Sequence, residues 1–551
     1  MPSELDRQYD EVLKELTGPG GMLTLGRDAT GRVIVTNFPD TVPGLLRTFC
    51  AMYADLEALV AGAERLTFAD LDRISERLAR ALVARGIAKG ERVAIAMRNC
   101  ASWLIVYMAA LKAGAVVTLL NGWWEKNELA HALELTDPRL VIADPPRTRR
   151  IDASGYGGEV VTLVIEQPVE QAIALLLEAG DADLPTIAGD DPATILFTSG
   201  STGDAKGALS LHRAVAMGAY TYATGLMVLL GLLTRDGRAP ATKPRTLLSV
   251  PLFHVTGEVP VMLNSFVVGR CMVLMDKWDA GEALKLIERE RITYFVGVPT
   301  MSLELMTHPD ADKHDLKSLT DIAAGGAPRP VSHVERLQQA FPSAQPALGY
   351  GLTETNAVGC HNFWANYAAK PGSTGRAHSP YVELAILGAE DRHLAQGETG
   401  EIAIRAAANI DRYWNAPEAT ADLFTADGYV RTGDVGYLDE DGYLFIVDRK
   451  KEIIIRGGEN ISAAEVEAAC YACPSVSEVA VFAAPDERLG EVPVAIVHMR
   501  DAMTAEALLG FLEGRLAKFK IPSRIILSDV ALPRLGTGKI DRRALKAHYS
   551  R

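Results

Sequence analysis

The sequence predicts an α/β protein: a large N-terminal domain, made of two parallel α/β subdomains and a β-rich subdomain, followed by a small mobile α+β C-terminal domain. Helix-like and strand-like patterns alternate through most of the chain, which favours this class. Shorter strands with glycine and aspartate turns follow Glu383, and the alternation returns near the C-terminus. With 551 residues the chain is several times the usual size of one domain, so more than one is expected.

The alternation is clearest between Leu66 and Asp144. The stretch from Leu66 to Gly90 has apolar residues at helical spacing and ends at a glycine, and a buried strand begins at Arg92. Another helix and another strand follow directly, which is the rhythm of a parallel sheet with crossover helices. The same rhythm recurs in the segments 270–275, 283–292, 293–299 and 321–326.

The β-rich texture is most evident in residues 436–458, where short strands are separated by Gly/Asp turns. We place the division of the chain just inside this region, between a large domain of residues 1–447 and a small domain of residues 448–551.

Composition restricts the class of partner and the compartment. A formal net charge of −14 with a pI near 5.4, and no compensating basic run, argues against a nucleic-acid partner. The N-terminus is charged and amphipathic rather than an apolar signal core, so a cytoplasmic location is expected. Six scattered cysteines do not make a disulfide framework, and Cys470 and Cys473 lie in a helix-like run where packing is the better interpretation.

One segment, Ala214 to Leu233, is uncharged over a length that could span a bilayer. It contains glycines, threonines and tyrosines and stands in the middle of the α/β pattern. We therefore expect a buried helix that covers a sheet, with no stable membrane span; peripheral membrane contact and a homodimer both stay open.

The stretch "ILFTSGSTGDAKGALS", Ile195 to Ser210, runs an apolar strand into hydroxyls, glycines and one lysine. Glycines let backbone N–H groups converge on an anion, and hydroxyls with an ammonium complete a phosphate cradle. The stretch does not match the usual P-loop, because Lys206 is followed by Gly207 rather than by serine or threonine.

Three further stretches supply complementary chemistry. In "GYGLTE", Tyr350 could stack on a base, Thr353 could bond a phosphate oxygen and Glu354 could hold Mg²⁺, which accepts oxygen ligands and few protein contacts. Asp434 is expected in a Thr-Gly-Asp turn, where its carboxylate is suited to accept both hydroxyls of a ribose. Lys539 stands in a glycine-rich loop before a basic helix near the C-terminus.

In this order and at these distances, the four motifs resemble the adenylate-forming (ANL) superfamily: acyl-CoA synthetases, luciferases and the adenylation domains of peptide synthetases. The resemblance covers nearly the whole chain and points to the acyl-CoA synthetase, or fatty-acid–CoA ligase, branch. It implies that the large domain holds the ATP and acyl sites, and that the small domain carries the hinge, the catalytic lysine and the face that meets coenzyme A. Catalytic roles are implied for Lys539, Thr353, Glu354 and Lys206, and magnesium binding for Glu354.

The resemblance assigns the remaining site residues one by one. The ATP-binding set is Thr198, Ser199, Gly200, Ser201, Thr202, Gly203, Lys206, Gly325, Gly326, Ala327, Tyr350, Gly351, Thr353, Asp434, Arg449 and Lys539. The acyl pocket is expected to include His254, Val298, Gly325 and Gly351, the hinge is Lys451, and the CoA side is Gly457, Gly458 and Glu459. The family usually has a proline before the lysine, whereas this chain has Ala205. Alanine should leave the loop slightly looser, at a cost of at most about 1 kcal/mol in folding free energy.

The implied reaction has two halves. A carboxylate attacks the α-phosphorus of Mg²⁺-bound ATP, which gives an acyl-adenylate and pyrophosphate; the small domain then turns about Lys451, and the thiol of coenzyme A displaces AMP. Positioning and preorganised cations would supply most of the catalysis.

The remaining questions are which carboxylic acid is activated and which thiol accepts the acyl group. Small residues in the acyl pocket leave room for a medium- or long-chain fatty acid, our first expectation; a phenylpropanoid acid such as coumarate or ferulate, or another aryl acid, is the alternative. The "GGEN" stretch favours coenzyme A over a carrier protein as acceptor. His254 stands where amino-acid-activating relatives have an aspartate, which disfavours an ammonium-bearing substrate. His254 either orients the carboxylate or is a wall residue, and Trp123 and Trp124 have only a packing interpretation.

Overall fold

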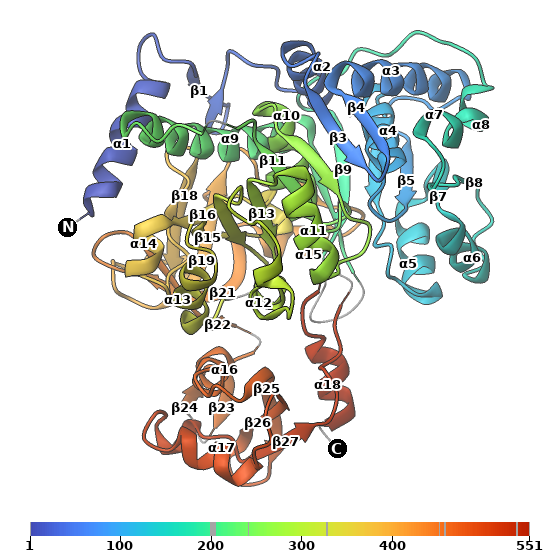
Figure 1. Ribbon diagram of the computed structural model, residues 1–551. Coiled ribbons are helices and arrows are strands. Elements are labelled where there is room, and N and C mark those ends of the chain that lie inside the picture. Colours follow the sequence, from blue (N-terminus) through green and yellow to red (C-terminus); the bar gives the residue numbers. More distant parts are fainter. Residues whose placement is uncertain are drawn as a thin grey trace.

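The computed structural model describes residues 2–198, 205–240, 242–326, 329–450, 452–456, 459–535 and 538–549 (Figure 1). It is a mixed α/β structure with extensive parallel sheets, which confirms the predicted fold class. Figure 1 shows the C-terminal part of the chain, in red, as a smaller body below the rest.

The first sheet has seven strands in the order β20-β10-β9-β6-β5-β7-β8. Its central strands are parallel, whereas β10 pairs antiparallel with both β9 and β20. The strands are β5 (Arg92–Ala96), β6 (Val116–Leu119), β7 (Leu140–Ala143), β8 (Val160–Thr162), β9 (Pro192–Phe197), β10 (Gly207–Leu211) and β20 (Arg412–Tyr413). Its helices are α3 (Phe68–Ala84), α4 (Ala101–Lys112), α5 (Lys126–Thr136), α6 (Pro145–Ala153), α7 (Val169–Ala172) and α8 (Ala174–Leu177).

The second sheet has nine strands in the order β17-β16-β15-β14-β13-β11-β12-β3-β4, again with a parallel centre. The strands are β3 (Glu57–Ala61), β4 (Glu64–Thr67), β11 (Arg245–Leu248), β12 (Cys271–Leu274), β13 (Tyr294–Gly297), β14 (Asp321–Ala324), β15 (Gln345–Gly351), β16 (Gly359–Phe363) and β17 (Arg376–Ala377). Helices α2 (Val42–Met52), α11 (Ala280–Glu290), α12 (Pro299–Thr307), α13 (Val331–Ala340) and α14 (Trp364–Ala369) belong to this part.

Helix α9 (His212–Arg235) contains the apolar segment noted in the sequence. It packs against β9, β10 and α10 (Asn264–Val267), and α1 (Glu4–Thr17) packs across its C-terminal part (Figure 1). Among the described residues it is the one helix long and apolar enough to cross a membrane, and 61% of its most apolar window is buried within the protein. The expected buried helix over a sheet is confirmed.

The β-rich part is a four-stranded antiparallel sheet in the order β18-β19-β21-β22. Its strands are β18 (Val382–Leu387), β19 (Gly400–Ala406), β21 (Val430–Leu438) and β22 (Leu444–Arg449). Asp434 pairs directly with Arg449 across β21 and β22, so the Thr-Gly-Asp segment lies within a strand and not in a turn as the sequence suggested.

The smaller body contains a separate sheet of β23 (Ile454–Arg456), β24 (Glu459–Ile461), β25 (Val476–Asp486), β26 (Gly490–Met499) and β27 (Arg524–Ser528). Helices α16 (Ala463–Tyr471), α17 (Ala505–Leu512) and α18 (Arg542–Tyr549) pack on it around a core of its own. Cys470 and Cys473 are buried in that core as free thiols, which confirms the packing interpretation.

One side-chain contact ties the small body to the large one near the strand ends of the second sheet. Arg534 donates from Nη1 to Oγ1 of Thr300 at 3.0 Å and to the backbone oxygen of Gly538 at 2.8 Å. Glu478 pairs with the other end of the same guanidinium. Arg534 thus fixes the loop that carries Lys539 against the start of α12.

Candidate active site

The predicted site residues gather where the parallel strands of the second sheet end. Val298 follows β13, Gly325 follows β14 and Gly351 closes β15. Ligands of open α/β sheets bind at the carboxyl ends of the strands, because the loops there converge without side chains filling the space. The loop of the small body that precedes α18 reaches the same edge: a Cβ added to Gly538 would lie 3.2 Å from Cγ2 of Val298.

Lys539 lies against Gly326. A Cβ added to Gly326 would stand 3.2 Å from Cε and 3.6 Å from Nζ of the lysine, and the φ of Gly326 is +75°, a conformation that favours glycine. Burial and the neighbouring charge of Arg449 lower the pKa of Lys539 to about 8, while Asp434 opposes the shift. An ammonium from the small domain therefore lies within electrostatic reach of the predicted ribose site.

Asp434 is held by two of the predicted ATP-binding residues. The hydroxyl of Tyr350 donates to its Oδ2 at 2.7 Å, and Nε of Arg449 lies 3.1 Å from its Oδ1. Burial raises the pKa of the Asp434 carboxyl, and the charge of Arg449 works against that rise. Burial also raises the pKa of the Tyr350 phenol, so this tyrosine stays a donor. A carboxylate fixed on both sides can present its remaining lone pairs to a pair of hydroxyls.

Glu354 lies in the short 3-10 turn Thr353–Thr355, directly after β15. Its Oε1 accepts a hydrogen bond of 2.6 Å from the hydroxyl of Tyr413, and Nζ of Lys206 stands 5.0 Å from the centre of the Tyr413 ring. Tyr413 therefore links the expected magnesium ligand to the lysine of the expected phosphate loop. Sequence reasoning missed it: Tyr413 meets β10 only through the β10–β20 pairing, and no local motif marks that long-range contact.

His254 remains neutral in this setting. Its Nδ1 accepts a hydrogen bond from the backbone N–H of Thr256 at 3.3 Å, which leaves the proton on Nε2. Burial, assisted by the nearby charge of Lys539, lowers the pKa of the imidazole to about 3. A neutral ring beside Lys539 can donate a hydrogen bond to a carboxylate but cannot add a second positive charge.

The strand-end glycines differ in the space around them. A Cβ on Gly325 would meet one atom within 4 Å, the backbone oxygen of Gly349 at 3.7 Å. A Cβ on Gly351 would stand 1.9 Å from the backbone oxygen of Ala357. Gly325 thus borders open space, whereas Gly351 allows two backbone segments to approach closely.

The expected phosphate loop joins the antiparallel strands β9 and β10, so it connects two strands rather than a strand and a helix. The backbone N–H of Thr198 donates to the oxygen of Lys206 at 3.0 Å and closes its base, and His131 contacts the backbone oxygen of Ala205 at 3.1 Å. Trp124 packs edge-on against Phe197 at 5.1 Å, and Arg147 stacks over Trp123.

Nine expected site residues lie outside the described residues: Ser199, Gly200, Ser201, Thr202, Gly203, Ala327, Lys451, Gly457 and Gly458.

The described residues contain no group of three or more histidine, cysteine, aspartate or glutamate side chains that could hold a metal by themselves. Magnesium does not need such a group, because it keeps several waters and is often held by one or two carboxylates together with substrate phosphates. Glu354, one carboxylate near Lys206, fits a magnesium that arrives with a nucleotide.

Glu459, the described member of the expected CoA side, begins β24 and pairs with Arg456 of β23. It lies in the small body, on the stretch that follows the expected hinge.

Comparison with known proteins agrees with this geometry. Residues 46–414 match the AMP-binding enzyme family, and residues 465–539 match the AMP-binding enzyme C-terminal domain. The chain is 33% identical over 489 residues to the long-chain-fatty-acid–CoA ligase FadD13 of Mycobacterium tuberculosis, covering 88% of this chain and 93% of the relative. It is 36% identical over 485 residues to a feruloyl-CoA synthase of an Amycolatopsis species, covering 87% and 93%.

Among solved structures, ATP-bound MatB from Rhodopseudomonas palustris superposes with a TM-score of 0.81 at 28% identity, over 92% of this chain and 99% of that one. Family domains, relatives and fold agree with one another and with the resemblance expected from the motifs. The chain belongs to the AMP-binding enzyme family, the adenylate-forming superfamily, and is an AMP-forming acyl-CoA ligase.

Proposed function

We propose that this ligase activates a medium- or long-chain carboxylic acid. In this proposal Lys539 is the cation that bridges the carboxylate and the α-phosphate of ATP during adenylation. The observation that carries the proposal is the place of Lys539: an ammonium from the small body lies against Gly326 and within electrostatic reach of Asp434, Arg449 and His254. Nucleotide and acid would meet at this point, where charge develops in the transition state.

The other residues take roles that their contacts support. Asp434, braced by Tyr350 and Arg449, would bind the ribose hydroxyls. Thr198, Lys206 and the hydroxyls of the loop between them would hold the β- and γ-phosphates, and Thr353 would bond a phosphate oxygen. Glu354 would hold the magnesium, which neutralises phosphate charge when bound. Loss of one such stabilising contact costs about 3 to 4 kcal/mol in comparable enzymes.

The second half-reaction would use a different orientation of the small domain, residues 448–551, on the large domain, residues 1–447. We assign the hinge to Lys451 and the CoA-side surface to Gly457, Gly458 and Glu459. The thiol of coenzyme A attacks the acyl carbonyl, the bond to the phosphate oxygen of AMP breaks, and the thiol proton is lost to solvent. In the orientation described here Lys539 lies against Gly326, which supports its proposed role in the first half-reaction.

The acid would extend from His254 and Val298 past Gly325 into the space beside β15. Aryl acids are the second candidate, because Tyr222, Tyr294 and His361 are aromatic side chains near that space and a 36% identical relative is a feruloyl-CoA synthase. A carrier protein as acceptor in place of coenzyme A is the remaining alternative. The reactants would meet in the cytoplasm.

A panel of acids tests the proposal. The full chain is mixed with ATP, Mg²⁺, coenzyme A and, in turn, fatty acids of increasing length, hydroxycinnamates and arylacetates, and AMP, pyrophosphate and thioester are measured. We expect AMP and thioester in equal amounts with medium or long fatty acids. Pyrophosphate exchange without a thioester would support the carrier-loading alternative. Preferred turnover of hydroxycinnamates would replace the fatty acid by an aryl acid.

A further inference from the structure

One face of the second sheet is turned toward α9, and the strand pairing shows which residues lie on this face. Successive side chains of a strand point to opposite faces, so Gly349 lies on the same face as its antiparallel partner His361 and as Ala347. Tyr294 and Ala347 pack against the core cluster to which α9 contributes Tyr220 and Ala223. This face, bounded by α9, is where an acid bound at the strand ends would place its tail.

Space remains on this face behind the strand ends. A Cβ on Gly349 would meet a single atom within 4 Å, the hydroxyl oxygen of Tyr222 at 3.9 Å. Tyr222 is fixed there, because its hydroxyl donates to the backbone oxygen of Ala357 at 2.6 Å. Tyr294 and His361 keep part of their surface accessible although protein surrounds them. Room for added atoms therefore remains beside Gly349, between β15 and Tyr222 of α9.

At the other end of the same face lies Arg270, between α10 and β12. Its side chain is 2% exposed, and its guanidinium lies over the ring of Tyr294, 4.6 Å from the ring centre. Nε and Nη1 are buried without any hydrogen-bond acceptor, and no carboxylate lies within ion-pair distance in the part of the chain that the structure describes. A buried guanidinium without acceptors is costly, because its lost hydration is not replaced.

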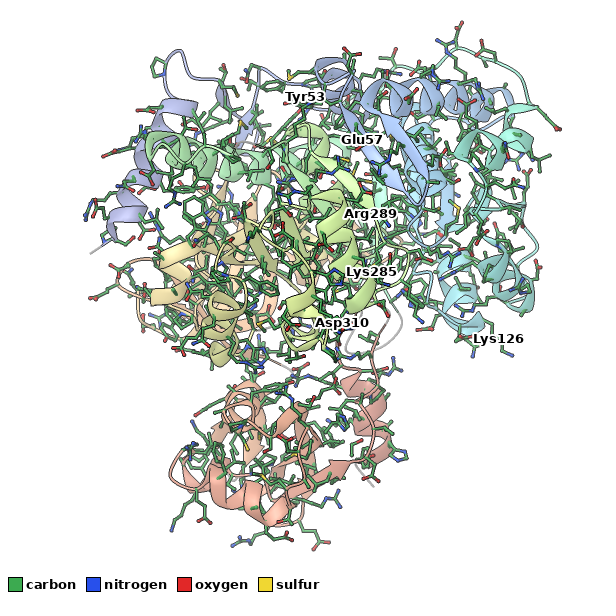
Figure 2. The ribbon with its side chains drawn as sticks, in the orientation of Figure 1. Tyr53, Glu57, Lys126, Lys285, Arg289 and Asp310 are labelled. Carbon is green, nitrogen blue, oxygen red and sulfur yellow. The ribbon has the colours of Figure 1, made fainter. Side chains whose placement is uncertain are left out.

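The arginines on the opposite face of this sheet are paired. Arg245 at the start of β11 bonds Glu57 at 2.7 Å and Glu290 at 2.9 Å. Arg65 pairs with both of these glutamates, and Arg289 pairs with Glu290. Glu57 begins β3 and Arg289 lies near the end of α11 (Figure 2). Arg65, Arg245 and Arg289 thus each have a carboxylate partner, whereas Arg270 has none among the residues that the structure describes.

We propose that Arg270 and Tyr294 form a distal subsite that binds a neutral oxygen, a hydroxyl or a carbonyl, at the end of the acid far from its carboxylate. The proposal rests on the proposed function, because it takes the carboxylate to be at Lys539. Val298 lies four residues along the chain from Tyr294, so the two ends of the site are about 13 Å apart at 3.3 Å per residue.

A neutral oxygen fits better than a second carboxylate. Asp321 starts β14 beside Tyr294 and its charge is felt at Arg270. Its two carboxylate oxygens already accept hydrogen bonds from Trp364 and Thr320, and it makes no direct ion pair with the guanidinium of Arg270. A second carboxylate on the substrate would face Asp321, whereas a hydroxyl or keto oxygen accepts from Arg270 without that repulsion.

The test compares matched acids that differ only in the distal oxygen. Fatty acids of increasing length are paired with their ω-hydroxy and terminal-keto analogues, and kcat/KM for thioester formation is measured with the full chain. We expect the oxygenated member to be favoured at least about tenfold at one chain length, because the subsite would leave Arg270 unpaired with the plain acid. Arg270→Met should reduce that ratio to about one, and Arg270→Lys should restore part of it.

Arg245→Met is the matched control: it removes a guanidinium from the same sheet edge but from the opposite face. It should lower Tm without changing the ratio. An unchanged ratio in Arg270→Met, or an equal loss with both acids, would overturn the subsite and leave Arg270 a structural residue. If no acid gives thioester, the proposed function fails instead, and calorimetric binding of the same acid pairs to both proteins still decides whether Arg270 recognises the oxygen.

Discussion

The hydroxyl of Tyr413 donates a 2.6 Å hydrogen bond to Oε1 of Glu354, while the ring of the same tyrosine lies 5.0 Å from the ammonium of Lys206. A tyrosine from β20 thus contacts two groups expected to bind the phosphates and their magnesium. Burial raises the pKa of the Tyr413 phenol, so it stays protonated and donates. The bond fixes one carboxylate oxygen of Glu354 and leaves the other for a metal.

Tyr413→Phe should weaken magnesium use more than ATP binding. Without the hydroxyl, Glu354 loses its orientation, and we expect adenylation at limiting Mg²⁺ to fall about tenfold, with partial recovery at high Mg²⁺. The measurement is pyrophosphate exchange over a magnesium titration. Tyr437→Phe is the control, since Tyr437 stacks on Phe445 in the β-rich sheet, away from these groups. Equal losses at low and high Mg²⁺ would contradict the orienting role.

Glu258 should make stability depend on pH. Its side chain is fully buried in the π-helix Gly257–Leu263, Tyr107 donates to its Oε1 at 2.7 Å, and burial raises its pKa to about 7. The folded state holds this proton more tightly than the unfolded state, so the contribution is complete below pH about 4.5 and is lost as pH rises through about 7. Glu258→Gln cannot ionise, and its Tm relative to the natural protein should therefore rise between pH 5 and 8. A difference in Tm that stays constant over this range would contradict the account.

Adenylation should slow as pH rises, because Lys539 must keep its proton to carry a positive charge. Because burial lowers the pKa of this lysine to about 8, it loses its charge as pH rises through that value. We expect kcat/KM for adenylation to fall above pH about 8, since this parameter reports groups of the free enzyme. Lys539→Arg should move the fall to higher pH, because a guanidinium keeps its charge. A limb that stays at the same pH would assign it to another group.

Arg534 should stabilise the orientation of the small domain that adenylation needs. Its contact with Thr300 joins the two bodies, so Arg534→Met should lower the rate of pyrophosphate exchange by about threefold to tenfold. Thioester formation from preformed acyl-adenylate should change little. The matched control is Arg543→Met, an exposed position on α18. Loss of both half-reactions together would indicate damage to the fold of the small body instead.

Much of the fold was predictable, because periodic apolar patterns are local. The alternation from Leu66 onward predicted the parallel strands β5 and β6, and the uncharged stretch in α9 was correctly expected to be buried. The strand location of Asp434 was not visible, since a Thr-Gly-Asp sequence has turn composition and only the pairing with Arg449 makes it a strand.

The site was predictable only where a motif marked it. Tyr413 and Arg270 carry no local signature: the first acts through the β10–β20 pairing, and the second is notable only because the structure leaves its guanidinium without an acceptor. Which neighbours a buried side chain meets is a property of packing between distant segments. No period or spacing in the sequence encodes it.

The most direct test of the account separates the two half-reactions in Lys539→Ala. Pyrophosphate exchange should fall by a factor of several hundred, as expected for the loss of one charge-stabilising contact, while thioester formation from preformed acyl-adenylate stays within about threefold. Lys546→Ala, which removes an exposed lysine of α18, should leave both rates unchanged. Equal loss of both half-reactions in Lys539→Ala would contradict the claim that Lys539 acts in the adenylation step alone.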